Sequence, residues 1–495
     1  MSANLYALFR ERFPADLSAR FLETPGGGIV DYAGVEGETA KLANALGALG
    51  VRPGDRVAVQ VEKSPEAVLL YLACLRAGAV FLPLNTAYRA EEVDGLLRDA
   101  EPALFVCAAG SEPTSSWLPC IRTLAADGSG SLASEARVAA DEHAVVDRGA
   151  DQAAVILYTS GTTGRSKGAV LSHGNLAANA RALHRAWGFG PGDVLLHVLP
   201  VYHAHGLFVA LHTTLLNGSG VIFLPRFDTG VVCDWLPRAT VMMGVPTHYV
   251  RLLREERFDA ARCRGMRLFV SGSAPLRQET FERFRERTGH TILERYGMTE
   301  TGMNTSNPLE GERVAGSVGP ALPGVELRVC DEHGRELSAG EVGGLEVRGP
   351  NVFREYWRMP EKTRSEFRDG GWFITGDLAR IDERGYVYLA GRSKDLIISG
   401  GLNVYPKEVE LVLDSLPGVL ETAVFGLEDA DLGEAVSAAV VCEPQAGALS
   451  AEQVIAHARK HLAAFKAPRR VFFLGGLPRN AMGKVQKARL RDELG

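Results

Sequence analysis

Apolar positions in the first part of the chain alternate between a helical and a strand-like spacing. At residues 36–49 and 66–76, apolar side chains recur every three or four positions, which predicts two buried helices. Each of these segments is followed by a short apolar run, at residues 56–61 and 79–82, that predicts a strand. The alternation resumes over residues 153–289. Because consecutive parallel strands need crossover helices, this order predicts an α/β architecture with parallel sheets.

The pattern changes after residue 316. From there, apolar and polar residues alternate in short segments separated by glycine-containing turns at residues 331–334 and 382–385. Period-two alternation bounded by such turns is typical of antiparallel strands. Residues 316–390 therefore predict a small antiparallel β-barrel or distorted sheet.

A mixed α+β pattern fills the C-terminal part of the chain. Pro406 stands where a helix is expected to begin, in the first turn that proline tolerates. Strands are predicted at residues 422–426 and 436–441, and a second helix at residues 451–462. This pattern predicts a separate, smaller C-terminal domain.

Composition excludes several classes of function. The chain has 495 residues, a formal net charge of −6 and a pI near 6.1, which argues against a general nucleic-acid binder. The seven cysteines are scattered without a CxxC pair, as in proteins of a reducing compartment that hold no metal cluster. The longest apolar region, residues 67–84, is interrupted by Arg76, Gly78 and Pro83, so it does not predict a membrane span. We expect a cytoplasmic protein that binds neither membranes nor nucleic acid. Its oligomeric state stays open.

The most distinctive segment is rich in glycine, serine and threonine and follows an apolar run at residues 153–157. Its candidate binding residues are Thr159, Ser160, Gly161, Thr162, Thr163, Gly164 and Lys167. A tight loop of this kind turns several backbone N–H groups toward one point. Lys167 adds a compact positive charge, so the segment suits a polyphosphate. It differs from a Walker A loop, because two residues separate Gly164 from Lys167. Taken alone, the segment also fits a flexible turn.

Four further motifs follow in a fixed order. They are Tyr296-Gly297-Met298-Thr299-Glu300, Ile374-Thr375-Gly376-Asp377, Gly391-Arg392-Ser393-Lys394-Asp395 and Pro478-Arg479-Asn480-Ala481-Met482-Gly483-Lys484. Together with the Gly/Ser/Thr segment, this order resembles the adenylate-forming superfamily of acyl-CoA synthetases, luciferases and peptide-synthetase adenylation domains. The resemblance covers nearly the whole chain and is strongest to malonyl-CoA synthetases. It implies a large N-terminal domain of two αβ subdomains plus a small distorted β-barrel, followed by a small mobile α+β domain.

The resemblance also implies how ATP and Mg²⁺ bind. Residues 159–167 would hold the pyrophosphate end of ATP, and Glu300 would bind Mg²⁺, which prefers carboxylate and phosphate oxygens. Thr299 would hydrogen-bond the α-phosphate. At the other end of the nucleotide, Asp377 would accept from the ribose hydroxyls, Tyr296 would stack on adenine with Gly297 and Met298 beside it, and Arg392 would contact ribose or phosphate.

The C-terminal lysine, Lys484, is assigned by the resemblance to the adenylation step, between the carboxylate and the α-phosphate. A compact charge on a long stem suits that task. We place the domain boundary at a hinge near Lys394, so that residues 1–391 form the nucleotide-binding domain and residues 392–495 a mobile lid. Rotation about this hinge would bring Lys484 to the site for adenylation. The other orientation would present Ser399, Gly400 and Gly401 along a tunnel for CoA, where glycines allow close approach.

The resemblance implies that the acid substrate binds beside a helix that begins near Pro246. Arg251 on this helix can grip a second carboxylate bidentately. The resemblance places further pocket residues at His203, His205, Ser271, Gly272, Ser273 and Met303. A short polar pocket with one cation fits a small dicarboxylic acid, namely malonate and also methylmalonate. The alternative for Arg251 is a surface ion pair with Glu255, four residues further along.

Four functions compete at this stage. The leading one is ATP-dependent ligation of malonate to CoA, with AMP and diphosphate as the other products. The second keeps the chemistry but changes the acid to another short, fatty or aromatic carboxylic acid. A third loads the acyl group onto a separate carrier protein, and a fourth is an inactive nucleotide-binding scaffold. Intact Lys167, Glu300, Asp377, Arg392 and Lys484 argue against the scaffold.

Overall fold

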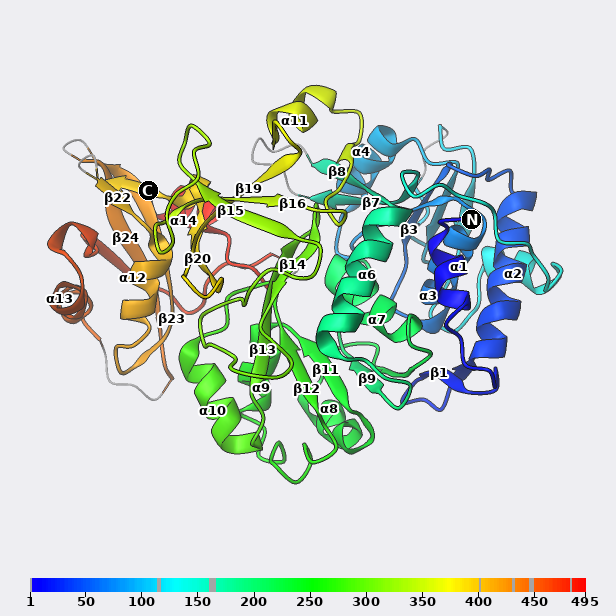
Figure 1. Ribbon diagram of the computed structural model, residues 1–495, viewed down its shortest axis with the longest axis horizontal. Coiled ribbons are helices and arrows are strands. Elements are labelled where there is room, and N and C mark those ends of the chain that lie inside the picture. Colours follow the sequence, from blue (N-terminus) through cyan, green and yellow to red (C-terminus); the bar gives the residue numbers. More distant parts are fainter. Residues whose placement is uncertain are drawn as a thin grey trace. The chain divides into compact units, whose positions relative to one another are not determined.

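The computed structural model describes residues 2–113, 117–159, 166–399, 402–429, 432–444, 449–480 and 483–495. The chain divides into two compact units. The first comprises Met1–Glu326 and Val347–Phe373, and the second comprises Leu327–Glu346 and Ile374–Gly495. Figure 1 labels the elements along the chain, and each unit has a core of its own.

One sheet of the first unit has seven strands in the order β17-β8-β7-β4-β3-β5-β6. These strands are Glu355–Tyr356, Lys167–Ser172, Ala153–Thr159, Val80–Pro83, Arg56–Gln60, Leu104–Cys107 and Ile121–Thr123. β7, β4, β3, β5 and β6 run parallel, and β8 and β17 extend the sheet antiparallel. The accompanying helices are α2 (Tyr32–Ala48), α3 (Pro65–Arg76), α4 (Ala90–Ala100) and α5 (Ser131–Arg137). The predicted helix–strand alternation is confirmed here.

Helix α3 shows how local sequence sets an element of this unit. Ser64 accepts a hydrogen bond from the Ala67 N–H at 3.1 Å, and Pro65 occupies the first turn. Every residue from Ala67 to Arg76 is buried, so the helix is a core helix. The one charged member of that run, Arg76, is satisfied by carbonyl oxygens, including that of His143 at 2.6 Å.

The other sheet of the first unit has eight strands in the order β14-β13-β12-β11-β9-β10-β1-β2. Its strands are Gly302–Ser306, Ile292–Met298, Leu268–Ser271, Val241–Gly244, Val194–His197, Gly220–Phe223, Arg20–Glu23 and Ile29–Asp31. The six from β13 to β1 run parallel, and β14 and β2 close the edges antiparallel. The helices that accompany it are α1 (Leu5–Arg10), α6 (His173–Trp187), the π-helix η1 (His205–Ala210), α7 (Leu211–Leu215), α8 (Thr229–Trp235), η2 (Leu236–Arg238), α9 (Pro246–Leu252) and α10 (Gln278–Thr288). Ligands of such sheets bind beyond the carboxyl ends of the parallel strands, so that edge is where a site is expected.

A five-stranded sheet occupies the region predicted as a barrel or distorted sheet. Its order is β15-β16-β19-β18, with β20 paired to β19. The strands are Glu326–Cys330, Gly343–Arg348, Trp372–Ile381, Phe367–Arg368 and Val387–Arg392, and α11 covers Pro360–Ser365. The pairing of β18 and β20 with β19 is antiparallel, as expected. Closure into a barrel stays a prediction.

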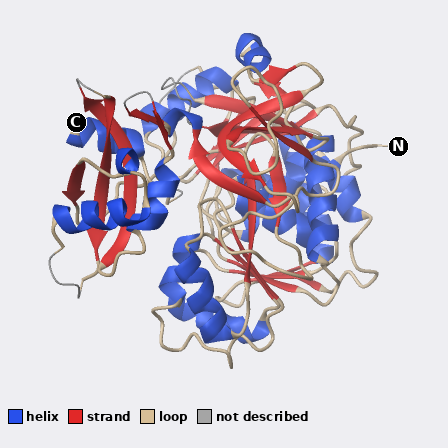
Figure 2. Ribbon diagram, turned by 60° about the vertical axis from the view of Figure 1, so that its left-hand side comes forward, coloured by secondary structure: helices blue, strands red, loops and turns tan. Residues whose placement is uncertain are grey.

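The second unit also contains another five-stranded sheet, near the C-terminus (Figure 2). Its strand order is β22-β21-β24-β23, with β25 paired to β24. Its strands are Leu402–Val404, Ile397–Ser399, Gly433–Cys442, Val419–Asp429 and Arg470–Phe473. The helices are η3 (Ser393–Asp395), α12 (Pro406–Leu413), α13 (Ala451–His461), η4 (Ala464–Lys466) and α14 (Lys487–Leu494). Pro406 opens α12 as predicted, and the predicted strands fall within β23 and β24.

Among the described residues, every helix is too short or too polar to span a membrane. All seven cysteines are free thiols, and among the described residues no cluster of three His, Cys, Asp or Glu side chains is arranged to hold a metal ion.

Candidate active site

Lys167 begins strand β8 and lies opposite Thr159, the last residue of β7. This hairpin brings together the two ends of the predicted phosphate loop. The Lys167 ammonium is 3.6 Å from Oε1 of Glu366 and 5.0 Å from the ring centroid of Tyr356. The intervening candidates Ser160, Gly161, Thr162, Thr163 and Gly164 lie outside the described residues, so their role as phosphate donors stays a prediction.

Glu300 stands in the turn that joins β13 to β14, immediately after the Tyr296–Met298 end of β13. Its side chain is buried, and the Tyr356 hydroxyl donates to Oε1 at 3.0 Å. The Phe353 N–H donates to the Glu300 carbonyl at 2.6 Å, so both the backbone and the side chain of this residue are fixed. At Gly297, a Cβ would overlap the carbonyl oxygen of Gly302, which explains the glycine in the Tyr-Gly-Met-Thr-Glu motif.

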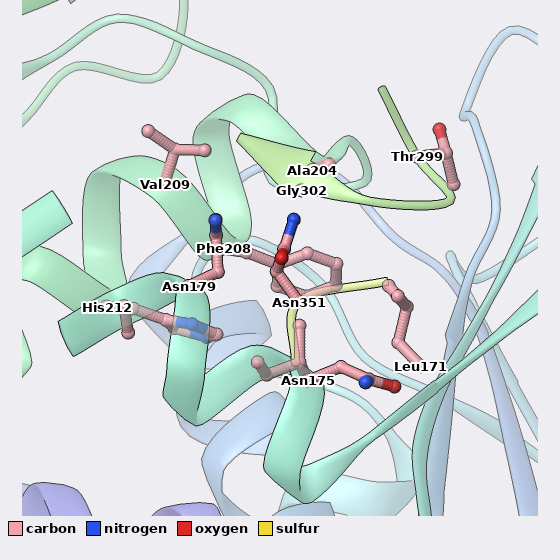
Figure 3. Close-up of a pocket in the computed structure, with 12 residues that line it drawn as sticks. Leu171, Asn175, Asn179, Ala204, Phe208, Val209, His212, Thr299, Gly302 and Asn351 are labelled. Carbon is pink, nitrogen blue, oxygen red and sulfur yellow. The ribbon is translucent and has the colours of Figure 1, made fainter. Parts of the chain in front are cut away.

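A small cavity lies beside Thr299 (Figure 3). Besides Thr299 itself, its polar lining comes from side chains on α6 and α7 and from the segment before β17. Asn179 donates to the Met303 carbonyl at 2.8 Å and accepts from the Met303 N–H at 3.1 Å. Asn351 donates to the Thr301 carbonyl at 2.8 Å. Two side-chain amides therefore hold the C-terminal side of the turn that carries Thr299 and Glu300.

In the second unit, Asp377 and Arg392 face each other across β19 and β20. The Arg392 Nε lies 2.7 Å from Oδ1 of Asp377, and Asp377 is mostly buried. Lys484 lies close enough to this pair for both charges to act on it, although the residue is exposed overall. Partial desolvation, and next the charge of Arg392, lower the pKa of Lys484, while Asp377 acts in the opposite direction. The structure thus brings together three predicted nucleotide-site residues that are far apart in sequence.

The hinge and CoA-tunnel candidates lie in the same unit. Lys394 is in the short helix η3, and Ser399 is a buried residue at the end of β21. Gly400 and Gly401 lie outside the described residues. The hinge at Lys394 and the tunnel stay predictions.

A buried polar cluster occupies the carboxyl ends of the parallel strands in the eight-stranded sheet. His197 ends β9, Ser271 ends β12, and Arg295 follows on the neighbouring β13. His205, the first residue of the π-helix, belongs to the same cluster. None of these four side chains is more than 3% exposed.

This cluster contains several buried polar atoms that have no hydrogen-bond partner in the described part of the chain. They are Nε and Nη2 of Arg295, Nε2 of His205, Nδ1 of His197 and Oγ of Ser271. Unpaired buried donors are costly and uncommon in folded proteins. Because they converge at one sheet edge, this cluster is a candidate pocket for a polar ligand.

Arg295 gives this candidate pocket its charge. Burial lowers the pKa of the Arg295 guanidinium to about 9, and no carboxylate of the described residues is among the groups whose charge acts on it. A Cβ on Gly272 would lie 2.5 Å from Cζ of Arg295, so glycine at that position leaves room for the guanidinium. The pocket therefore favours an anion, most strongly a carboxylate that can take both free N–H groups.

The histidines of the pocket are neutral. Burial, and next the charge of Arg295, drive the pKa of His205 well below its usual range. His205 Nδ1 lies 3.2 Å from the Ser273 hydroxyl, and its backbone N–H donates to His203 Nδ1 at 3.3 Å. Ser273 has a positive φ of 70°, a strained conformation often found at functional sites. With Ser273 donating to Nδ1, the remaining Nε2–H of His205 can donate to a substrate oxygen.

Arg251, predicted from sequence as the carboxylate ligand, lies in the last turn of α9 with an exposed side chain. The alternative partner of Arg251 is Glu255, which lies beyond the end of α9 at Leu252. Glu255 accepts from Arg257 Nε at 3.1 Å instead. Met303 is buried on β14, the strand next to the β13 strand that carries Arg295. The structure thus offers two arginines for the second carboxylate, one exposed and one buried.

Comparison with known proteins defines the family. Residues 11–357 match the AMP-binding enzyme family and residues 408–484 match the AMP-binding enzyme C-terminal domain. The chain belongs to the AMP-binding enzyme family. It is 35% identical to a malonate–CoA ligase of Arabidopsis thaliana, covering 92% of this chain and 80% of the relative. It is 36% identical to a feruloyl-CoA synthase of an Amycolatopsis species, covering 95% of each. A solved structure of ATP-bound MatB from Rhodopseudomonas palustris is 53% identical, with a TM-score of 0.97 over 100% of this chain and 99% of that one.

Membership of the AMP-binding enzyme family confirms the resemblance drawn from the ordered motifs and the two-part fold that it implied. It is also consistent with ATP and CoA as co-substrates and with Mg²⁺. The residues present fit a metal ion that arrives with the nucleotide. Mg²⁺ usually takes one or two carboxylates and completes its shell with phosphates and water, and the buried carboxylate of Glu300 can supply that single protein ligand.

Two residues of this AMP-binding enzyme were missed from sequence. Arg295 directly precedes the Tyr296 motif, and the available signal was a charged residue inside an otherwise apolar strand. Tyr356 contacts Glu300 and Lys167 from a strand of only two residues, for which the sequence carried no signal.

Proposed function

We propose that this protein is a malonyl-CoA synthetase, which joins malonate to CoA with ATP and releases AMP and diphosphate. The observation that carries this proposal is the buried Arg295 guanidinium, whose Nε and Nη2 have no partner among the described residues. The malonate–CoA ligase relative at 35% identity and MatB at 53% support it. The feruloyl-CoA synthase at 36% shows that overall identity alone does not select the acid, so the pocket must do so.

The pocket explains selectivity for a dicarboxylic acid. One carboxylate must remain accessible to ATP, so a second carboxylate on the substrate is what can pair with Arg295. A monocarboxylic acid would leave the guanidinium buried and unpaired, which is the situation that rejects an analogue most strongly. The neutral His205 and the hydroxyl of Ser271 add donors without adding charge. A substrate of malonate size, with methylmalonate as a close variant, suits this arrangement.

The reaction proceeds in two steps. In the first, a malonate carboxylate oxygen attacks the α-phosphorus of ATP and the bond to pyrophosphate breaks, giving malonyl-adenylate. Lys167 neutralises charge on the leaving pyrophosphate, Thr299 donates to the α-phosphate, and Glu300 supplies the carboxylate for Mg²⁺, which stabilises phosphate charge when bound. In the second, the CoA thiolate attacks the acyl carbon and AMP leaves.

We further propose that the two steps use different orientations of the C-terminal domain about Lys394. Lys484 then acts in adenylation, while Asp377 and Arg392 serve the ribose and phosphate. Their grouping with Lys484 in one unit supports this assignment. A cytoplasmic location is also proposed, on the seven free cysteines.

The test is thioester formation with ATP, CoA and equal concentrations of malonate, methylmalonate, succinate, acetate and benzoate. We expect strong turnover of malonate, some turnover of methylmalonate and little of the others. Preference for benzoate or acetate would overturn the malonate assignment and leave the family unchanged. Turnover that requires a phosphopantetheinyl carrier protein instead of CoA would favour the carrier-loading alternative.

A further inference from the structure

The short segment at residues 351–357 braces two parts of the nucleotide site. On one side, β17 pairs antiparallel with β8, and the Trp357 N–H donates to the Gly168 carbonyl at 2.7 Å. On the other side, the segment holds the Thr299–Thr301 turn. The Phe353 N–H donates to the Glu300 carbonyl at 2.6 Å, and the Asn351 amide, seen in Figure 3, donates to the Thr301 carbonyl at 2.8 Å. The strand that begins at Lys167 and the turn that carries Glu300 thus share one support.

Tyr356 is the residue of this segment whose side chain touches both charged groups. It is 3% exposed and packs edge-on against Phe353, with ring centroids 4.7 Å apart. Its hydroxyl donates to Oε1 of Glu300 at 3.0 Å. Its ring centroid lies 5.0 Å from the Lys167 ammonium, within the range of a cation–π contact.

These two contacts act on the charges in different ways. A hydroxyl that donates to one carboxylate oxygen favours the ionised form and fixes the orientation of the other oxygen. The ring face attracts the Lys167 ammonium without neutralising its charge. The Glu366 carboxylate, whose Oε1 lies 3.6 Å from that ammonium, is shared with Lys362. One rigid side chain therefore sets the relative positions of the cation and the carboxylate that must meet the same polyphosphate.

We propose that Tyr356 is a positioning residue for the Mg²⁺–pyrophosphate end of the active site. It orients Glu300 through its hydroxyl and Lys167 through its ring. This inference rests on the proposed function only for the roles of Glu300 and Lys167, and it does not depend on which acid the enzyme uses.

Two substitutions separate the two contacts. Tyr356→Phe removes the hydroxyl and keeps the ring, so it should disturb the contact with Glu300 and spare the contact with Lys167. Tyr356→Leu removes both. Tyr32→Phe is the matched control, because the Tyr32 hydroxyl is also buried in the first unit and donates to the Ser219 carbonyl at 2.8 Å, away from the site.

The experiment measures Mn²⁺ binding in the presence of ATP by electron paramagnetic resonance, together with the Mg²⁺ dependence of pyrophosphate exchange. The acid used is whichever one the unmodified enzyme prefers. Loss of a contact that orients a metal ligand typically weakens metal binding about 10- to 100-fold. We expect Tyr356→Phe to weaken Mn²⁺ binding about tenfold at an unchanged KM for the acid. Tyr356→Leu should in addition raise the KM for ATP, and Tyr32→Phe should change neither.

Thermal unfolding of the three variants checks that the effect is local. Tyr356→Phe and Tyr32→Phe each lose one buried hydrogen bond and should lower the Tm by similar amounts. Equal Mn²⁺ binding by Tyr356→Phe and Tyr32→Phe would overturn the proposal. A preference of the unmodified enzyme for another acid would instead overturn the malonate assignment and leave the role of Tyr356 intact.

Discussion

Replacement of Arg295 by methionine should make the protein more stable and at the same time destroy its use of malonate. Each pKa unit corresponds to about 1.4 kcal/mol. Burial lowers the pKa of Arg295 to about 9, well below the ordinary value of a guanidinium, so it costs the charged form on the order of 5 kcal/mol. Methionine fills much of the same volume without charge, and replacement of buried charged groups by apolar residues commonly stabilises proteins by about 1–4 kcal/mol.

The effect on activity has the opposite sign. A malonate carboxylate that pairs with Arg295 loses its partner in the variant. Breaking a buried charge pair costs about 3–5 kcal/mol, which corresponds to a fall in kcat/KM of about 10²- to 10⁴-fold. Turnover of propionate, which lacks the second carboxylate, should fall far less, since Arg295 has no charged partner in that substrate.

The assay combines kcat/KM for malonate and propionate with urea unfolding of Arg295→Met. Arg251→Met is the matched control, because Arg251 is exposed and competes for the same role. We expect the control to retain malonate activity within about twofold, as surface substitutions usually change little. Near-normal malonate turnover in Arg295→Met together with a large loss in Arg251→Met would refute the assignment of Arg295 and restore that of Arg251.

Three further predictions concern the candidate acid pocket, the C-terminal lysine and the stability of the fold. In Gly272→Ala, the new Cβ would lie 2.5 Å from Cζ of Arg295, so the substitution should displace the guanidinium and raise the KM for malonate more than the KM for ATP. Steady-state kinetics measure both KM values, and equal changes would count against this prediction. Lys484→Ala should abolish pyrophosphate exchange yet still convert supplied malonyl-adenylate and CoA to malonyl-CoA, and loss of both half-reactions would argue against domain alternation. Desolvation, and next the charge of Arg148, lower the pKa of the buried His173 to about 4. As the pH falls through about 6.5, the unfolded chain therefore binds a proton at His173 while the folded protein keeps this histidine neutral. The free energy of unfolding should therefore fall from about pH 6.5 toward pH 4 by on the order of 3 kcal/mol from this residue. His173→Asn, which keeps an acceptor for the Leu5 N–H, should flatten that fall in urea titrations, and an unchanged slope would exclude the explanation.

The grouping of the candidate nucleotide-site residues could be predicted from sequence because they lie in short motifs, while their role in binding the nucleotide stays a prediction. Asp377 and Arg392 belong to separate motifs, and the antiparallel register of β19 and β20 brings them within 2.7 Å. The alternation of helices and strands was equally visible, because burial on one or both faces imposes a period on the apolar residues.

The candidate acid pocket could be predicted only in part. The structure brings His205 and Ser273 together, and their role in binding the acid stays a prediction. The choice between Arg251 and Arg295 depends on burial, which local sequence does not determine. Arg295 is buried because β13 lies next to β12 at the carboxyl edge of the sheet, a pairing between segments about twenty residues apart. Tyr356 was missed for the same reason, since its contacts with Lys167 and Glu300 cross long stretches of chain.

Pairing of a second substrate carboxylate with the buried Arg295 can be tested on the unmodified enzyme. The quantity to measure is the ratio of kcat/KM for malonate to that for propionate, at saturating ATP and CoA. We expect a ratio of at least about 10², because only malonate satisfies the Arg295 guanidinium. A ratio near one would mean that the pocket does not recognise the second carboxylate.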